Sequence, residues 1–373
     1  MKVAILGGGQ LGRMLAPEGI PLGVDFRFLE PAPGPPAEAL GVVVRAGYED
    51  RSGLDAVASG VDVVTYEFEN VPVSSARHLE QAVPVLPPPA ALEMAQDRLV
   101  EKQGFAAVGM PTTGFHAVDD PGDVAAALEA LGAPAVFKTR RFGYDGKGQA
   151  VVGDVEEGLG FVRERSQPLI AEAFVDFDRE LSLIAVAGRG GERRFYPLTE
   201  NHHREGILRV SYAPAGGVTP AVQQKAEQYA SALIDYLGYV GVLAIEFFQI
   251  GDELLANEIA PRVHNSGHWT QDGAPVSQFE NHIRAVLGLP LGSTASVRPT
   301  AMINLIGTVP PASSLLGIPE AHLHLYGKEP RPGRKLGHVN VVADEWSRVL
   351  DAMDEVVAQL VLEAPLPGPH LPG

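Results

Sequence analysis

Residues 242–258 read VLAIEFFQIGDELLANE and form the most informative segment of the chain. Two apolar runs, 242–249 and 253–258, flank a Gly-Asp turn, so we expect an antiparallel pair of strands. Each run carries one carboxylate among apolar neighbours, Glu246 in the first and Glu258 in the second. Burying a carboxylate is costly unless it is paired or bound to a metal.

Pairing of the two strands would bring Glu246 and Glu258 to one face, together with Asn257. Hard oxygen ligands of this kind suit Mg²⁺ that carries substrate phosphates. The alternative is that both acids lie at strand ends and face solvent. We expect a magnesium site that contains Glu246 and Glu258.

A polar loop, RVHNSGHW at residues 262–269, follows the second strand. His264 and His268 are four residues apart, a spacing that could hold zinc on a helix. Pro261, Gly267 and the lack of an H-E-x-x-H pattern favour a loop instead. We therefore expect contacts to substrate and anions here, although His268 is equally compatible with a structural role.

A basic, glycine-rich loop, KTRRFGYDGKGQ, occupies residues 138–149. Its glycines allow backbone N–H groups to approach a polyphosphate, and its four cations can neutralise the charge. The Walker A pattern is absent. We expect phosphate binding, with a solvated basic hairpin as the alternative. A second basic segment, YGKEPRPGRK at 326–335, could complete a phosphate site, but the sequence by itself does not bring the two together.

The N-terminal residues 7–12 read GGGQLG and satisfy G-x-G-x-x-G. Glu30 lies where NAD enzymes have a ribose-binding acid, so the motif indicates either a dinucleotide site or a plain strand–helix turn. The four strands expected around it alternate with helical stretches, a pattern typical of a parallel α/β sheet; they span residues 3–6, 25–29, 41–44 and 61–66. The proline cluster at 84–89 predicts a domain boundary.

The rest of the chain predicts further helices and strands. The expected helices span 90–104, 123–131, 223–237 and 345–362. The expected strands, besides those named above, span 135–138, 149–152, 169–172, 180–187 and 195–198. From Met302 onward the pattern predicts a small, separate β-rich unit.

Composition narrows the classes of function. The chain has 373 residues, enough for two or three domains. It has no cysteine, which excludes disulfides, zinc–thiolate clusters and thiol nucleophiles. A net charge of −17 argues against nonspecific binding to nucleic acid or to an anionic membrane, and the apolar runs are too short for a bilayer span. We expect a cytoplasmic protein.

Six groups of residues resemble one family of the ATP-grasp superfamily. They are GQLGRM (9–14), QDR (96–98), GYDGKGQ (143–149), GIL (206–208), NEIAPRVHNSGHWT (257–270) and RPGRK (331–335). The fifth is long and specific. Together they are similar to the N5-carboxyaminoimidazole ribonucleotide synthetases, biotin-independent carboxylases of bacterial purine synthesis, and the resemblance covers nearly the whole chain.

This resemblance implies an α/β (α+β) ATP-grasp fold in three parts. They are a Rossmann-like domain without NAD at 1–89, an ATP-grasp domain at 90–298 with a mobile lid at about 112–172, and a small β-rich domain at 299–373. The implied reaction is ATP-dependent carboxylation of 5-aminoimidazole ribonucleotide (AIR) by bicarbonate through carboxyphosphate. It gives N5-carboxyaminoimidazole ribonucleotide, ADP and phosphate in purine (IMP) biosynthesis. Mg²⁺ and a homodimer are implied, without nucleic-acid or membrane partners.

The resemblance also implies roles for nucleotide-binding residues. Arg98 and Lys138 contact the phosphates, loop 143–149 closes over them, the backbone of residues 172–175 reads adenine, and Glu180 binds ribose. By residue, the loop and the linker are Gly143, Tyr144, Asp145, Gly146, Lys147, Gly148, Gln149, Glu172, Ala173, Phe174 and Val175. His203 and Asn257 complete the nucleotide site with Glu258, although His202 leaves the register at His203 open. Glu246 and Glu258 match the magnesium ligands.

A last group of positions matches the residues that handle AIR and bicarbonate. They are Tyr144, Asp145, Arg262, His264, Asn265, Lys328 and either Arg334 or Lys335. Arg262 would hold bicarbonate, and later carboxyphosphate, through paired N–H bonds. Because the reactive intermediate is a phosphorylated substrate, no enzyme nucleophile is needed, in agreement with a chain that lacks cysteine.

Three other functions compete with this one. An NAD-dependent oxidoreductase would use the glycine turn and Glu30 but leaves the basic loop and the acidic pair unexplained. An ATP-binding regulatory or scaffold protein would have no use for Arg262. A sibling ligase with another amine or acid as acceptor is the nearest rival, because ATP-grasp relatives share the nucleotide site and differ in the acceptor pocket.

Overall fold

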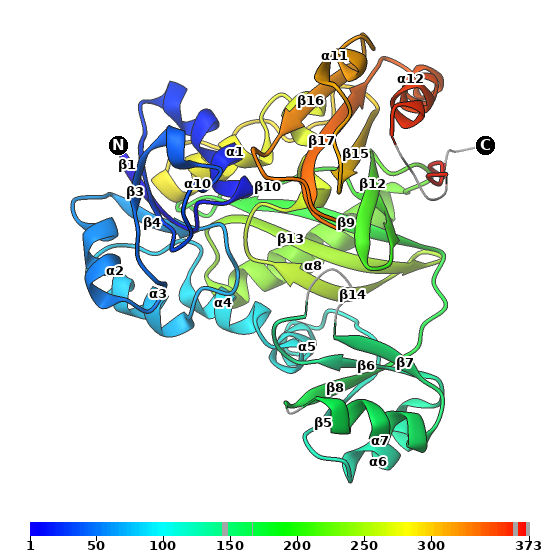
Figure 1. Ribbon diagram of the computed structural model, residues 1–373. Helices are drawn as coiled ribbons and strands as arrows, with labels where there is room; N and C mark the ends of the chain where they lie inside the picture. Colours follow the sequence, from blue (N-terminus) through cyan, green and yellow to red (C-terminus); the bar gives the residue numbers. More distant parts are fainter. Residues whose placement is uncertain (144–147, 166, 361–364, 371–373) are drawn as a thin grey trace.

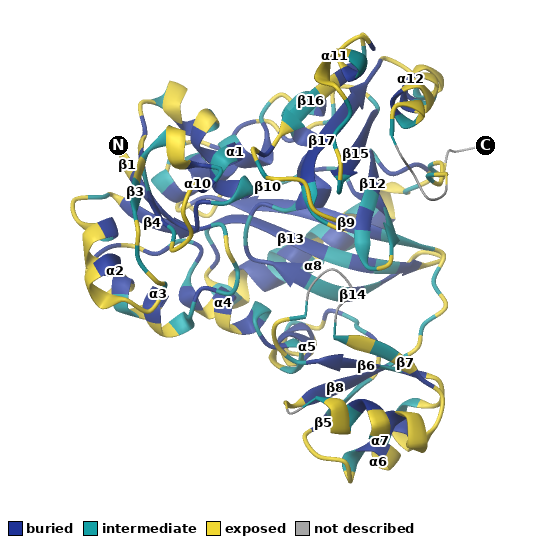
Figure 2. Ribbon diagram, viewed as in Figure 1, coloured by how far each residue is buried: buried dark blue, intermediate teal, exposed yellow. Residues whose placement is uncertain are grey.

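The computed structural model of the chain describes residues 1–143, 148–165, 167–360 and 365–370 (Figure 1). Within these ranges the strands form three sheets. Figure 2 shows that the central strands are mostly buried, whereas the peripheral helices expose their outer sides. None of the helices in these ranges combines the length and apolar character that a bilayer span requires.

The N-terminal sheet is parallel, in the order β3-β2-β1-β4, as the alternating pattern predicts. Its strands are β1 (Lys2–Leu6), β2 (Asp25–Leu29), β3 (Val42–Val44) and β4 (Val63–Tyr66). Its helical segments are α1 (Gln10–Gly19), η1 (Ile20–Leu22), η2 (Glu38–Leu40), α2 (Arg51–Ala58) and α3 (Val73–Glu80). Residues 3–6 are fully buried, because a central parallel strand is covered on both faces.

Two helices follow where the sequence predicts one helix over 90–104, so that prediction is wrong. They are α4 (Pro89–Ala95) and α5 (Arg98–Ala107). The break has a local cause: the Asp97 carboxylate accepts hydrogen bonds from two backbone N–H groups in the first turn of α5. A capping residue of this kind has an extended backbone and so cannot continue the preceding helix.

A small antiparallel sheet, in the order β5-β8-β6-β7, lies at the bottom of Figure 1. Its strands are β5 (Phe115–Val118), β6 (Ala135–Thr139), β7 (Gln149–Val152) and β8 (Leu169–Ala173). The helices α6 (Asp123–Leu131) and α7 (Val155–Glu164) pack on it around Phe137. We call this sheet with its two helices the lid.

The central sheet has the order β14-β13-β9-β11-β12-β15-β17-β16, with β10 on β9. Its strands are β9 (Arg179–Ala187), β10 (Arg193–Phe195), β11 (Thr199–Arg204), β12 (Ile207–Ala213), β13 (Gly241–Ile250), β14 (Glu253–Ala260), β15 (Thr300–Ile306), β16 (Ala321–Leu325) and β17 (Lys335–Val342). Its helical segments are α8 (Pro220–Leu237), η3 (Asn265–Gly267), α9 (Thr270–Gly273), α10 (Gln278–Leu287), α11 (Ala312–Leu315) and α12 (Trp346–Ala358).

Alternate residues of β9 serve two different cores, because successive side chains of a strand point to opposite faces. Leu183 belongs to the core that contains α8, whereas Ile184 belongs to the core that contains α10 and the N-terminal sheet. The β13–β14 pair therefore lies between two packed layers. Its polar side chains are held on a rigid support.

Two expectations about the second half of the chain need correction. The predicted strand at 195–198 is wrong, since β10 ends at Phe195 and β11 begins at Thr199. Pro197 lies between them and has no N–H for a ladder. The β-rich unit expected from Met302 onward is not separate from the rest of the sheet. β15 pairs with β12, so the C-terminal strands extend the central sheet. Helix α12 ends at Ala358, and residues 361–362 of the predicted helix lie outside the described residues.

Candidate active site

The two acidic strands form the predicted antiparallel pair, and Glu246 lies directly opposite Glu258. The register shifts after this pair, because Phe247 pairs with Ala256 and leaves Asn257 as the extra residue of a β-bulge. A bulge re-aims the side chain of the extra residue. The Asn257 Oδ1 atom is buried and has no hydrogen-bond partner, so an oxygen ligand without a partner lies next to the acidic pair.

The electrostatics of this pair favour the binding of a cation. Burial raises the pKa of Glu246 to about 7, and the neighbouring charge of Glu258 acts in the same direction. For Glu258, burial also raises the pKa, but the guanidinium of Arg98 outweighs it and lowers the pKa below its ordinary value. A bound cation would reduce the repulsion between two opposed carboxylates of this kind.

The donor set fits Mg²⁺. In the part of the chain that the structure describes, no group of three or more His, Cys, Asp or Glu side chains is arranged to hold a metal. Two carboxylates and one amide oxygen therefore need further oxygens from a substrate. This is how Mg²⁺ is usually held, since it retains waters and phosphate oxygens in its shell.

Arg98 begins α5 and reaches across to the acidic pair. Its Nη1 donates to Glu258 Oε2 at 2.9 Å. The next basic side chains contact the neighbouring Asp97 instead. Arg140 makes two hydrogen bonds of 2.9 Å to Asp97, and Arg141 is 3.3 Å from the same carboxylate. Two of the four cations of the predicted phosphate loop are thus used to hold the start of α5.

Lys138, the third cation of that loop, lies at a buried carboxylate. Its Nζ is 3.1 Å from Glu172 Oε1, and the Nζ of Lys102 is 3.3 Å from Glu172 Oε2. Burial raises the pKa of Glu172, but Lys138 and Lys102 outweigh burial and lower it to about 2. The Glu172 side chain is therefore committed to lysines, which leaves only its backbone for the predicted contact with adenine.

The linker after β8 leads from the lid to the central sheet. Ala173 is the last residue of β8, and Phe174, half exposed, and Val175 follow it. Gly148 and Gln149 lie at the start of β7, which β6 separates from β8 in the lid sheet. Gly143 precedes them in the chain. The predicted residues Tyr144, Asp145, Gly146 and Lys147 lie outside the described residues.

Glu180 and His203 face each other on neighbouring strands. His203 Nδ1 is 2.5 Å from Glu180 Oε2. Burial lowers the pKa of His203, and the Glu180 carboxylate outweighs burial and raises it. His202 instead contacts Glu200 at 2.8 Å, because consecutive side chains of a strand point to opposite faces. The structure therefore places His203, and not His202, beside Glu180.

The loop after β14 brings Arg262 and His264 to the same region. Arg262 Nη2 is 2.8 Å from Glu69 Oε2, a carboxylate from the turn between β4 and α3. His264 Nε2 is 3.6 Å from Glu246 Oε1, and its Nδ1 is 2.9 Å from Ser266 Oγ. Burial and the charge of Arg262 lower the pKa of His264 well below its ordinary value. His264 is therefore a neutral imidazole at physiological pH.

Asn265 is engaged in a structural pair. Its amide and that of Asn304 on β15 exchange hydrogen bonds of 3.1 and 2.8 Å. Because both carboxamides are buried, this pair fixes the loop to the C-terminal part of the central sheet. The Asn265 side chain thus helps to hold the loop in place. Its contact with substrate stays a prediction.

Of the two residues of the second basic segment that could contact substrate, Arg334 and Lys335, only Lys335 lies near the acidic pair. The charge of Lys335 acts on His203, Glu246 and His264, whereas Arg334 donates to the Glu329 carbonyl at 3.1 Å on the surface. Elsewhere in the segment, Lys328 Nζ donates to Gln10 Oε1 of the glycine turn. The segment therefore links the site to the N-terminal sheet.

The glycine turn has no room for a dinucleotide phosphate. The backbone N–H groups of Gly9 and Leu11 donate to the Glu67 carboxylate at 2.8 and 3.2 Å. Gly8 N–H donates to Glu30 at 3.0 Å, so the acid expected at a ribose is bound to the turn itself. The groups that would bind a pyrophosphate already hold side chains, which argues against the NAD alternative.

Several residues of the site have no counterpart in the sequence prediction: Glu67, Glu69, Glu101 and Lys102. Glu101 is buried on α5 and accepts a hydrogen bond from the N–H of Ile259 at 2.7 Å. Burial and the charge of Glu258 raise its pKa to about 8. In the sequence, adjacent Glu and Lys in a helix indicate an ordinary solvated face, so no local signal marks them.

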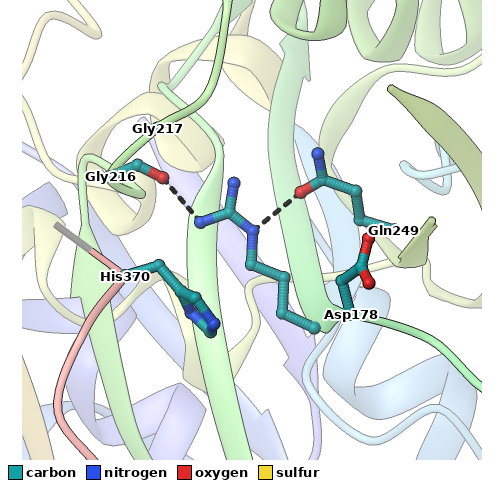
Figure 3. Close-up of a pocket in the computed structure, with 6 residues that line it drawn as sticks. Asp178, Gly216, Gly217, Gln249 and His370 are labelled. Carbon is teal, nitrogen blue, oxygen red and sulfur yellow. Dashed lines mark hydrogen bonds between the residues drawn. The ribbon is translucent and has the colours of Figure 1, made fainter. Parts of the chain in front are cut away.

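A separate small pocket lies on the other side of β9 (Figure 3). Arg179 donates to the Gly216 carbonyl at 2.6 Å and to Gln249 Oε1 at 2.7 Å there, and His370 lies at its edge. Arg179 and Glu180 are consecutive, so their side chains point to opposite faces of the sheet. This pocket is therefore distinct from the site around Glu246.

Three family models match successive parts of the chain. They are a ribonucleotide synthetase preATP-grasp domain at 1–96, an ATP-grasp domain at 103–279 and a phosphoribosylaminoimidazole carboxylase C-terminal domain at 300–352.

Individual relatives match nearly the whole chain. The N5-carboxyaminoimidazole ribonucleotide synthase of Pseudomonas aeruginosa is 52% identical over 96% of this chain and 99% of its own length. The crystal structure of N5-carboxyaminoimidazole ribonucleotide synthetase from Thermus thermophilus matches with a TM-score of 0.94 and 53% identity, covering 98% of this chain and 100% of that one. The Aspergillus clavatus synthase, in complex with ADP and AIR, matches with a TM-score of 0.87 and 31% identity, covering 96% and 98%.

Proposed function

The chain belongs to the N5-carboxyaminoimidazole ribonucleotide synthase family of ATP-grasp ligases, and we propose that it carboxylates AIR with ATP and bicarbonate. The products are N5-carboxyaminoimidazole ribonucleotide, ADP and phosphate. The observation that carries this function is the constellation at β13 and β14: opposed Glu246 and Glu258, with Arg98 on the second acid. This constellation lies in a chain that matches known synthases over almost their full length.

ATP is the nucleotide, in keeping with the relative from Aspergillus clavatus whose structure contains ATP. Lys138 and Arg98 would neutralise its phosphates, and the backbone of residues 172–175 would read the adenine edge. Glu180, oriented by His203, would accept hydrogen bonds from ribose hydroxyls. A carboxylate held by a charged partner keeps its lone pairs in a fixed direction.

Mg²⁺ would be held by Glu246, Glu258 and the Asn257 oxygen. When bound, the ion supplies positive charge against the γ-phosphate during its transfer. Arg98 keeps Glu258 ionised by lowering its pKa. The protein thereby maintains one fully charged ligand on β14 at neutral pH.

Bicarbonate would be held by Arg262, whose guanidinium can make paired N–H bonds to a carboxylate-like anion. Bicarbonate is a poor electrophile, so ATP first converts it to carboxyphosphate, and the amine of AIR then attacks the activated carbon or CO₂ released beside it. Neutral His264 next to Arg262 adds no competing charge. Closure of the lid over the site would limit hydrolysis of the intermediate.

The AIR phosphate would lie near Lys335 and Lys328, which approach the site from the C-terminal strands. Tyr144 and Asp145 remain predicted contacts of the same substrate. The boundaries of the three domains, the homodimer and the cytoplasmic location also stay predictions.

An ADP-release assay tests the function. Purified protein should release ADP in a reaction that requires bicarbonate and Mg²⁺ and is stimulated by AIR. Glycinamide ribonucleotide and simple amino acids, offered in place of AIR, distinguish a sibling ligase. If AIR gives no stimulation while another acceptor does, the proposed acceptor is wrong.

A further inference from the structure

Lys102 is a fully buried lysine that contacts both the central sheet and the lid. Its side chain is 1% exposed. The Nζ atom is 2.9 Å from the Asn257 carbonyl, 3.3 Å from the Ala256 carbonyl and 3.3 Å from Glu172 Oε2. The two carbonyls belong to the bulge of β14, whereas Glu172 belongs to β8 of the lid.

The same place is the junction where the chain enters the lid. Thr112 Oγ1 donates to the Ala256 carbonyl at 2.7 Å, and the Ala256 N–H donates to the Pro111 carbonyl at 2.7 Å. Thr113 Oγ1 donates to Glu172 Oε2 at 3.2 Å. Lys102 is thus the cation at the centre of a contact between the lid and β14.

The carboxylate of Glu172 divides its two oxygens between two lysines. Oε2 takes Lys102 from the central body, and Oε1 takes Lys138 from β6 of the lid, at 3.1 Å. One rigid, buried carboxylate therefore sets the separation of the two ammonium groups. A buried ammonium is costly to desolvate, so a lysine at this position has to form all of these contacts to be tolerated.

We propose that Lys102 is a positioning residue that acts through Glu172 to fix Lys138 relative to the bulge that precedes Glu258. Lys138 comes from the lid and Glu258 from the central sheet, and both must meet one triphosphate at the same time. Lys102 supplies the charged contact in this junction, beside the hydrogen bonds of Thr112 and Thr113. This inference rests on the proposed role of Lys138 at the nucleotide phosphates.

The test compares Lys102→Met with Lys225→Met. Lys225 is a matched control, because its Nζ also contacts a backbone carbonyl, that of Asp252, and a carboxylate, that of Glu253, at 3.2 and 3.0 Å, but on the surface at the other end of β14. ADP release is measured with ATP varied at saturating AIR, and with AIR varied at saturating ATP.

We expect Lys102→Met to lower kcat/KM for ATP by about 10- to 100-fold, the range seen when a residue that orients a ligand is removed. The KM for AIR should change by less than about twofold, and Lys225→Met should match the unaltered enzyme. Unchanged ATP kinetics in folded Lys102→Met would overturn the inference. Absence of AIR-stimulated ADP release in the unaltered enzyme would instead refute the proposed function.

A second comparison does not depend on the stability of Lys102→Met. Glu172→Gln keeps the shape of the side chain. Combining it with Lys102→Met removes the charge at both positions, so the double variant has no unpaired buried charge at either of them. Because Lys102 acts through Glu172, adding Lys102→Met to Glu172→Gln should change kcat/KM for ATP by less than about threefold. A further loss of tenfold or more would show that Lys102 acts by another route.

Discussion

The glycine turn and the β13–β14 pair both contain groups that bind charged ligands, but the charges that face these groups differ. At the turn, the N–H groups of Gly9 and Leu11 already hold the carboxylate of Glu67. At the strand pair, Glu246 opposes Glu258 and the Asn257 oxygen has no hydrogen-bond partner. A motif therefore identifies the groups that can bind, and the state of their partners identifies where a ligand is needed.

The largest effect should follow removal of charge from the strand pair. Glu258→Gln should lower AIR-stimulated ADP release by about a thousandfold or more, since a bound cation contributes several kcal/mol of transition-state stabilisation. The thermal unfolding curve should be retained, because the substitution preserves shape. Activity within tenfold of the unaltered enzyme would remove Glu258 from the metal site.

A substitution in the glycine turn should lower the stability of the protein and leave the Mg²⁺ dependence of its activity unchanged. Glu67→Ala leaves two backbone N–H groups without their acceptor, and we expect a loss of about 1–3 kcal/mol in the free energy of unfolding. Urea denaturation measures this loss. The concentration of Mg²⁺ that gives half-maximal ADP release should be unchanged in the folded variant, and a large shift would show that the two regions are not independent.

The pKa of Glu246, raised to about 7 by burial and by Glu258, predicts a pH dependence for Mg²⁺. Below this pKa the carboxyl is protonated, and the ion must displace the proton to bind. The apparent affinity for Mg²⁺ should therefore fall by about tenfold per pH unit below 7 and level off above it. Mg²⁺ titrations of ADP release at several pH values measure it. A flat profile between pH 6 and 8 would contradict the raised pKa.

The smallest effect is expected from a dinucleotide. Because the turn holds Glu67 and Glu30, NADH should leave the melting temperature unchanged. ATP with Mg²⁺ at about 100 times its dissociation constant should stabilise the protein by about 2.7 kcal/mol. Thermal denaturation with each ligand makes the comparison, and protection by NADH alone would reverse our assignment of the two regions.

Local patterns were sufficient to predict the features that depend on neighbouring residues. The apolar runs around Glu246 and Glu258 predict their strands, and the paired strands are confirmed with both acids on opposite positions. The buried strand at residues 3–6 is predicted for the same reason, since a central parallel strand must be apolar along its length.

Features that depend on distant residues could not be predicted in this way. Lys102 and Glu101 lie on a helix whose sequence looks solvated, and their burial follows from β14, more than 150 positions away. Glu69 contacts Arg262 from the turn between β4 and α3. The break between α4 and α5 had a local signal in Asp97, a common capping residue, which the surrounding helix formers outweighed.

The bulge at Asn257 has a consequence for how this hairpin can change in evolution. Because Asn257 is an extra residue, a deletion of that single codon would leave Ala256 opposite Phe247 and Glu258 opposite Glu246. The acids would stay opposed, while the amide oxygen and one of the two carbonyls that accept from Lys102 would be lost. A change in chain length by one residue would thus weaken the metal site and the junction with the lid together, whereas a point substitution of Asn257 would remove the side-chain oxygen and keep the carbonyl.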